Sequence, residues 1–447
     1  MKKNGGQALV VVTVIFTIVA IGAVLGVTSP IVSQLAMAKT LESSKKSYFT
    51  AEAGSEDAFY RVRNNLPALF PLTLTLDGAV AITNMDTVGL NEQQIISEGN
   101  ANDHIRTVLK DITVSDGFSF HSAVQVGIGG LNMLNTSKVI GNVYSEGPIK
   151  SNDSGTRIAG DAVSSGAGGV IEAANILGTA YAHEIKGNTK ICGDAHYQII
   201  NSSSLNFLNS PASPCSDPLT PGTAYPTSPD QLSLPMPISD DLLDQWESDA
   251  VSGGVINSPC PYKITSGTVT LGPVKINCDF EVGGNGTVII MAGAIWVNGN
   301  FTINNNPKFK VSDSLGNKSV PLVVRSASNP TQRGLITLNN NPEFYGSESG
   351  GTPNPDSYVM LVSRNTGALA GTGDKAIISG NNVTGNLLLY APHGEIELSN
   401  NVILRAVTAH TLTLKNNVEV HYTIGLSQTM FTSGPGGQWK VKRWQEI

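Results

Sequence analysis

The run from Ala8 to Val27 reads ALVVVTVIFTIVAIGAVLGV and contains no charge. No charged residue occurs between Lys3 and Lys39. A helix rises about 1.5 Å per residue, so about 20 apolar residues cross the hydrocarbon core of a bilayer. We therefore predict a single transmembrane helix over residues 8–27. The lysines before it predict a short cytoplasmic N-terminus and an exported C-terminal domain.

Composition separates the rest of the chain from ordinary helical proteins. Of 447 residues only 14% are charged, whereas 47 are glycine. Such a composition suits short strands and tight turns, so a mainly β protein is expected behind the helix. The net charge of −7 comes without a basic cluster, so no nucleic-acid partner is expected. Gly-x-Ser-x-Gly, Walker, His-Glu-x-x-His and Cys-x-x-Cys motifs are absent from the sequence, so we expect no enzyme, cofactor or metal site.

A helical pattern continues beyond the apolar run. Between Pro30 and Asn64 apolar residues recur at roughly helical spacing, with Lys, Glu, Asp and Arg between them. This predicts a transmembrane and amphipathic stalk helix over residues 7–65. Pro30 lacks a backbone donor, which predicts a bend or a melted turn there. Residues 35–38, LAMA, offer the alternative of a secretory signal cleaved before Lys39.

Three features occur in order at the N-terminus: the basic start MKKNGG, the uncharged helix, and SYFTAEAG at residues 47–54. This segment, residues 1–65 only, resembles PilX-type minor pilins and is similar to K-type minor pseudopilins of type II secretion. The resemblance implies a leader, residues 1–6, that prepilin peptidase removes after Gly6, leaving Gln7 first. Cleavage after Gly5 is the alternative. It also implies that the helix first anchors in the inner membrane and then packs against other pilins or pseudopilins.

One position departs from the pattern of major pilins, which resemble each other in a Glu five residues after the cut. Here that position is Val11, and the first acidic residue is Glu42. PilX- and K-type subunits often lack this Glu, so the resemblance implies a minor subunit. A plain single-pass membrane anchor is the alternative.

The segment after the stalk is predicted to be a small β connecting region, residues 66–118. Pro67 and Pro71 end the helix. Alternating apolar residues follow in LTLTL at 72–76 and in IRTVLKDITV at 105–114, which is typical of strands.

A repeat occupies residues 119–430. Gly141, Gly160, Gly178 and Gly193 each begin a similar motif at spacings of 19, 18 and 15, and the pairs beginning at Asn381, Asn400 and Asn416 are spaced 19 and 16 apart. Periods this short predict a right-handed parallel β-helix (β-solenoid), with handedness not settled by the repeat itself. Gly and Asn tolerate the left-handed backbone of corners, and stacked Asn side chains hydrogen-bond along the repeat. A β-sandwich with Asn-rich turns is the alternative.

An excursion at about residues 199–250 interrupts the repeat. Ser239 is a predicted N-cap of a short helix whose apolar face contains Leu242, Leu243 and Trp246. Four cysteines in an exported chain predict two disulfides. Three connectivities are open, and the shortest loops favour two pairs, Cys192 with Cys215 and Cys260 with Cys278; four free buried thiols are the alternative.

Smaller features complete the prediction. Residues 431–447 contain Trp439 and Trp444 and are predicted to cap the end of the solenoid, with partner binding by these tryptophans as the alternative. His183 and His196 sit in neighbouring repeats, where they can stack, although surface or core histidines satisfied by the backbone are the favoured interpretation. Asp161 and Asp194 follow repeat glycines and are expected at corners.

We therefore expect a minor-pilin-like structural subunit of a type IV pilus or type II secretion-like system. It would present a β-solenoid at the pilus or cell surface for assembly, a tip role or adhesion to a glycan or surface protein. The alternatives are a membrane-anchored β-helix enzyme acting on polysaccharide, known only by analogy of fold, and a surface adhesin.

Overall fold

The computed structural model describes residues 5–63, 70–89, 92–114, 120–152, 154–201, 205–207, 222–423, 426, 429–432 and 439–447. The chain is mainly β and divides into two compact units. We call Met1–Ser115 with Gln438–Ile447 the helix–sheet unit, and Asp116–Gly437 the ladder unit. The expectation of a mainly β chain behind a long N-terminal helix is confirmed.

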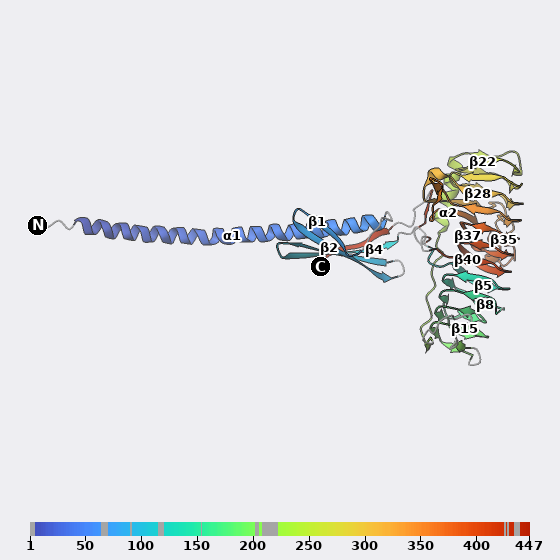
Figure 1. The fold of residues 1–447 in the computed structure, drawn as a ribbon, viewed down its shortest axis with the longest axis horizontal. Helices are drawn as coiled ribbons and strands as arrows, with labels where there is room; N and C mark the ends of the chain where they lie inside the picture. Colours follow the sequence, from blue (N-terminus) through green and yellow to red (C-terminus); the bar gives the residue numbers. More distant parts are fainter. Residues whose placement is uncertain are drawn as a thin grey trace. The chain divides into compact units, whose positions relative to one another are not determined.

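The helix–sheet unit is built on α1 (Gly5–Arg63), which lies along an antiparallel sheet (Figure 1). The helix runs through Pro30 without interruption, so the predicted melted turn is wrong, while the alternative of a bend stays a prediction. A proline removes a single backbone donor, and here the neighbouring turns persist, with the Thr28 hydroxyl donating to the Val24 carbonyl. The sheet has the order β1 (Leu72–Leu76), β2 (Ala79–Gly89), β3 (Glu92–Ala101), β4 (His104–Val114) and β42 (Trp439–Glu446).

The last strand of this sheet comes from the C-terminus. β42 pairs antiparallel with β4, and Val114 lies opposite Trp439. The prediction that residues 431–447 cap a solenoid is therefore wrong for 439–447, while 433–438 lie outside the described residues. Alternating basic residues in WKVKRWQE suit an exposed sheet edge, where charge discourages further pairing. In the sequence, the whole ladder unit is inserted between two strands that pair with each other.

The ladder unit consists mainly of three ladders of parallel strands (Figure 1). Ladder 1 contains, in spatial order, β20 (Val255–Ile256), β23 (Val274–Ile276), β26 (Ile295–Val297), β29 (Lys318–Val324), β34 (Val359–Ser363), β37 (Leu387–Ser399), β39 (Ala406–Lys415), β5 (Val124–Met133), β7 (Val143–Ser145), β10 (Ala162–Ser164), β13 (Ala180–Tyr181), β16 (Ala195–Tyr197) and β19 (Ala224–Pro226).

Ladder 2 shares its three long central strands, β37, β39 and β5, with ladder 1. Its other strands are β21 (Tyr262–Ile264), β24 (Phe280–Val282), β27 (Phe301–Ile303), β30 (Ile336–Leu338) and β35 (Lys375–Ser379) on one side, and β8 (Ile149–Ser151), β11 (Val170–Glu172), β14 (Glu184–Lys186) and β17 (Ile199–Ile200) on the other.

Ladder 3 completes each pass of the chain; one pass comprises a strand position in ladder 1, one in ladder 2 and one in ladder 3. It contains, in spatial order, β22 (Thr268–Leu271), β25 (Val288–Met291), β28 (Lys308–Val311), β31 (Glu343–Tyr345), β36 (Thr384–Gly385), β38 (Ile403–Leu404), β40 (Glu419–His421), β6 (Lys138–Ile140), β9 (Arg157–Ile158), β12 (Asn175–Ile176), β15 (Thr189–Ile191) and β18 (Leu205–Phe207). Smaller elements are β32 (Glu348–Ser349), β33 (Thr352–Pro353), β41 (Met430–Phe431), η1 (Asp313–Leu315) and α3 (Gly367–Ala370).

The chain enters the ladders in the middle rather than at an end. A first run, residues 124–226, proceeds from β5 to β19. The chain then continues through a segment at 227–239, which we call the strap, and α2 (Asp240–Ser252). A second run, residues 255–421, starts at β20 and ends at β39 and β40, which pair with β5 and β6. We call this junction of the first and last passes the seam.

The repeat motifs of the sequence stack as expected. A Cβ on Gly160, Gly178 or Gly193 would lie 2.5–2.7 Å from a carbonyl carbon of the preceding repeat glycine, so only glycine fits this column. Apolar side chains point inward and form one continuous core. In the second run, Phe280 stacks on Phe301 with ring centroids 5.0 Å apart.

The predicted excursion at about 199–250 starts too early, because strands at 199–200, 205–207 and 224–226 still pair in the ladders. Its short helix is as the sequence indicated. Ser239 caps α2 by accepting a hydrogen bond from the Leu242 backbone N–H. Leu242, Leu243 and Trp246 are buried in a second core on the outside of ladder 1, together with Tyr390. The Tyr390 hydroxyl donates to the Ile238 carbonyl over 2.6 Å, which fastens the end of the strap.

Candidate assembly surface

The C-terminal part of α1 has a face of small residues that lies against the sheet. Its buried members recur every three or four positions, as one helical face requires: Ser43, Ser47, Thr50, Ala51, Ser55 and Ala58. Glycines on both elements allow a very close approach. A Cβ on Gly54 would lie 2.6 Å from the Ser97 hydroxyl, and one on Gly99 would lie 2.1 Å from the Ser47 carbonyl oxygen.

Polar contacts fix how the helix is placed on the sheet. The Ala101 backbone N–H donates to the Ser47 hydroxyl over 3.1 Å. Lys110 is buried on the sheet, and its ammonium donates to the Glu56 carboxylate over 2.7 Å. A buried ammonium needs such a partner, because desolvating an unpaired charge costs several kcal/mol. The sequence did not single out Lys110, since nothing in its local pattern marks it as buried.

The SYFTAEAG segment is the part of α1 that docks on the sheet. Thr50, Ala51 and Gly54 are buried in this contact. Tyr48 meets the Trp444 ring edge-on, with centroids 6.4 Å apart, so the C-terminal strand contributes to the same surface. Partial desolvation, followed by the carboxylates of Glu52 and Glu446, raises the pKa of Tyr48. The phenol therefore stays neutral at physiological pH.

The N-terminal part of α1 is different, because its large apolar side chains are exposed. Leu9 is 71% exposed, Phe16 75% and Leu35 56%. The change from exposed to buried falls between Leu41 and Ser43. One helix thus combines a docked segment with a long apolar segment that has no partner among the described residues.

Among the described residues, no helix is both long enough and apolar enough to span a bilayer. Membrane insertion of residues 8–27 stays a prediction.

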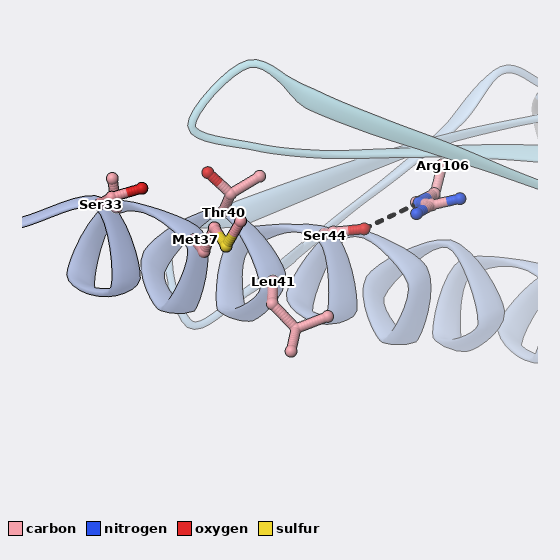
Figure 2. Close-up of a pocket in the computed structure, with 7 residues that line it drawn as sticks. Ser33, Met37, Thr40, Leu41, Ser44 and Arg106 are labelled. Atoms are coloured by element: carbon pink, nitrogen blue, oxygen red, sulfur yellow. Dashed lines mark hydrogen bonds between the residues drawn. The ribbon is translucent and has the colours of Figure 1, made fainter. Parts of the chain in front are cut away.

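A hollow of about 440 Å³ lies where the docked and exposed segments of α1 meet (Figure 2). On the helix it is lined by residues that include Met37, Thr40 and Leu41, and Arg106 reaches it from β4. The Arg106 Nε donates to the Ser44 hydroxyl over 2.9 Å, and its Nη1 lies 3.1 Å from a Glu446 carboxylate oxygen. This surface combines apolar side chains, Met37 among them, with an arginine held by a hydrogen bond and an ion pair; both residue types are enriched at protein interfaces.

The predicted processing residues lie at the start of the helix. Gly6 and Gln7 belong to the first turn of α1, which begins at Gly5. Residues 1–4 of the predicted leader lie outside the described residues. Cleavage after Gly6 stays a prediction.

The cysteines lie in the ladder unit. Cys260 and Cys278 form a disulfide with Cα atoms 5.9 Å apart, which is the pairing favoured by the shorter loop. Cys192 is also disulfide-bonded. Its expected partner Cys215 lies outside the described residues.

The remaining singled-out residues have structural roles. Asp161 and Asp194 each accept a backbone hydrogen bond from the next pass, at the Thr179 and Thr223 N–H groups, as expected of corner residues.

The two histidines, in contrast, do not stack on each other. His196 stacks between Tyr181 and Tyr225, whereas His183 contacts Asp230 of the strap. The sequence did not predict this because a repeat places neighbours one period apart, and Tyr181 rather than His183 lies opposite His196.

Comparison with known proteins adds little to this geometry. No family model and no curated protein matches the chain. Among solved structures, the competence-associated pilin ComZ from Thermus thermophilus is similar over 91% of this chain and 97% of its own, with 13% sequence identity and a TM-score of 0.40. A likeness at that distance carries no argument about function, which has to be inferred from the residues of this chain.

Proposed function

We propose that this chain is a minor-pilin-like structural subunit of a type IV pilus or a type II secretion-like system. The observation that supports this is the division of α1 between Leu41 and Ser43. An apolar helix surface of this length is unfavourable in water and requires a partner. Lipid of the inner membrane, and then the helices of other pilins or pseudopilins, would cover it.

The proposed subfamily follows from the N-terminus. Prepilin peptidase would cut after Gly6 and release a chain that starts at Gln7. Val11 stands where major pilins resemble each other in having Glu, which favours a PilX- or K-type subunit. The helix would anchor the subunit as a single-pass protein before assembly.

We further propose that the three ladders form a right-handed parallel β-helix, or β-solenoid, displayed at the pilus or cell surface. Parallel pairing at one-period offsets supports this: Ala162 lies opposite Ala180, which lies opposite Ala195. A unit of this bulk is unsuited to the packed shaft of a filament, so a tip or priming position is favoured. Its role would be structural rather than catalytic.

The mature N-terminus tests the assembly proposal. Mass spectrometry of the chain isolated from its native host should find Gln7 first, with or without methylation. A Gly6→Arg variant should keep its leader, whereas the matched Gly5→Ser variant should still be processed. A chain starting at Lys39 would indicate an ordinary cleaved signal, and an intact Met1 would indicate a plain anchor; either overturns the proposal.

The tip position needs a separate measurement. Immunogold labelling of filaments against the ladder unit should place the label at filament ends. Label spread evenly along the shaft would overturn the tip position while leaving subunit assembly intact.

A further inference from the structure

One corner of the ladder unit carries a continuous row of exposed amides. The row lies at the turns between ladder 2 and ladder 3, with one asparagine in each successive pass, and it crosses the seam to end at Thr136. We call it the asparagine row; its members are Asn285, Asn306, Asn341, Asn382, Asn401 and Asn417. Every member is exposed.

The row is ordered by hydrogen bonds that all run in the same direction. Each Nδ2 donates to the Oδ1 of the neighbouring asparagine, over 2.8–3.2 Å, and the Thr136 hydroxyl donates to Asn417. An amide has two N–H donors and two acceptor lone pairs, and these bonds use one of each. Each interior member therefore presents a further donor and a further acceptor, repeated at the strand spacing of about 4.8 Å.

Backbone conformation alone does not explain why these residues are asparagines. Asn341, Asn382 and Asn401 have φ of 59°, 47° and 62°, in the left-handed region. Glycine adopts the same region without strain, and Gly284 and Gly286 do so at this corner. What asparagine adds to glycine is the amide, which either strengthens the ladder or binds something outside it.

The row leads at one end to a polar hollow. The hollow has a volume of about 290 Å³, near the lower limit for small-ligand sites, and it is formed by β21, β24 and the turns that follow β24 and β27. Thr265, Asn304 and Asn305 line it. Lys263 and Glu281 also line it and form an ion pair, with the Lys263 Nζ 2.7 Å from the Glu281 Oε2. Both donors and acceptors thus face this hollow.

We propose that the asparagine row and this hollow bind a neutral, extended polysaccharide, with successive hydroxyl groups on the row and one ring in the hollow. A hydroxyl group both donates and accepts, so it matches the free donor and acceptor of each amide. The row itself contains no charged side chain, and the two charges in the hollow, Lys263 and Glu281, are paired with each other, so neither a polyanion nor a polycation is favoured. A chain of sugar rings repeating at close to the strand spacing meets one amide after another. This inference rests on the proposed display of the ladder unit outside the cell.

Co-sedimentation of the purified full-length chain, in detergent, tests the proposal. Insoluble cellulose and chitin, both neutral and extended, are the probes, and polygalacturonate gels are the charged comparison. We expect at least one neutral probe to bind and the charged one not to bind. An Asn382→Gly/Asn401→Gly variant keeps a backbone that glycine tolerates and should raise the Kd about tenfold or more, since it removes two amides that would bond to sugar hydroxyls.

A shorter amide ladder at another corner supplies the matched control. Asn277 donates to Asn257 over 3.0 Å, and Asn298 donates to Asn277 over 2.9 Å. An Asn277→Gly/Asn298→Gly variant loses the same number of amides outside the proposed site and should bind as the wild type does. Thermal unfolding of both variants verifies that each is folded.

Several results would overturn the inference. In the first, the purified chain binds neither neutral probe; in the second, it binds the charged gel equally well. In the third, the two double variants lose the same amount of glycan binding. In the last, Asn382→Gly/Asn401→Gly loses self-association, as measured by analytical ultracentrifugation, and keeps its glycan binding. The assay needs neither processing nor filaments, so its failure leaves the assembly proposal standing. A mature N-terminus other than Gln7 refutes assembly without changing the binding result.

Discussion

The two runs of the ladder unit reach the same parallel pairing with different side chains. The second run fills its interior with rings: Phe280 stacks on Phe301, and Phe309 stacks on Phe344 with centroids 5.3 Å apart. The first run uses smaller side chains, with alanine on ladder 1, as at Ala180 and Ala195, isoleucine on ladder 2, as at Ile171, and narrow glycine corners. Burial stabilises in proportion to apolar area, so each pass of the second run contributes more.

The seam makes this difference matter. The first pass of the first run, on β5, pairs along its length with β39, the end of the second run. The first run therefore starts on a surface that the better-packed second run provides. We infer that the second run holds its structure without the first, whereas the first depends on the second and on the strap that lies over it.

Removing a stacked ring should have the largest effect. Phe301 is fully buried, so Phe301→Ala should lower the free energy of unfolding by about 3–5 kcal/mol. If the first run depends on the second, hydrogen exchange should quicken in both runs. The measurement is hydrogen–deuterium exchange of the full chain, read peptide by peptide by mass spectrometry.

The matched substitution lies in the first run. Ile171 is also fully buried, and Ile171→Ala should cost about 2–5 kcal/mol. In the Ile171→Ala variant, hydrogen exchange should quicken from β7 to β19, whereas the second run should stay protected. Equal loss of protection in both runs for both variants would mean one cooperative ladder and would break the comparison.

The strap should have an intermediate effect. The Tyr144 hydroxyl accepts from the Leu234 N–H over 2.7 Å and is within 3.1 Å of the Leu232 carbonyl. Tyr144→Phe removes a part-buried hydrogen bond and should cost about 0.5–1.5 kcal/mol. Exchange should quicken in the strap and in the first run beneath it.

The corresponding variant at the other end of the strap is Tyr390→Phe. This phenol lies in the second run, and burial raises its pKa, so it stays a donor to the Ile238 carbonyl. Losing this hydrogen bond should quicken hydrogen exchange near residue 238 and at the start of α2, while the first run keeps its protection. Faster exchange of the first run in this variant would contradict a strap that fastens each run separately.

Local patterns in the sequence predicted what lies one period away, and no more. The glycine column and the stacked asparagines follow directly from spacings of 15–19 residues, because each pass repeats the chemistry of the last. The seam is not periodic: Val407 lies opposite Val124, and nothing in either strand distinguishes that partner from any other parallel strand. The order of the passes therefore could not be predicted from the repeat.

The same limit applies to the candidate assembly surface. Helical spacing predicted α1 nearly to its end at Arg63. It did not predict that Trp439 lies opposite Val114, because alternation in β42 fits any edge strand and the partner is more than 300 residues away. Gly99 carried no local signal either, since its role is to admit the Ser47 carbonyl of a different element.

The smallest expected effect concerns an ion pair that crosses the seam. Glu419 of the second run accepts from Lys138 of the first over 2.7 Å. The hydrogen bond from Lys138, followed by that from His421, lowers the pKa of Glu419 from its ordinary value of 4.5. Both side chains are about one-quarter to one-third exposed, at 24% and 32%, so the pair should contribute about 1 kcal/mol or less.

Its pH dependence has a definite sign. Above pH 4.5 Glu419 is charged in both the folded and unfolded chain, and the stabilisation is complete; below it the unfolded chain takes up the proton first. The stabilisation is then lost as the pH falls through the lower folded pKa. In urea unfolding, Glu419→Gln should therefore have a lower free energy of unfolding than the wild type at about pH 6, and the difference should shrink towards about pH 3.

Glu397→Gln is the control, because it breaks ion pairs with Lys375 and Lys415 inside the second run. It should leave hydrogen exchange in β5 and β6 unchanged, whereas Glu419→Gln should quicken it. If the two variants alter β5 and β6 alike, the seam is no weaker than the pairings within a run.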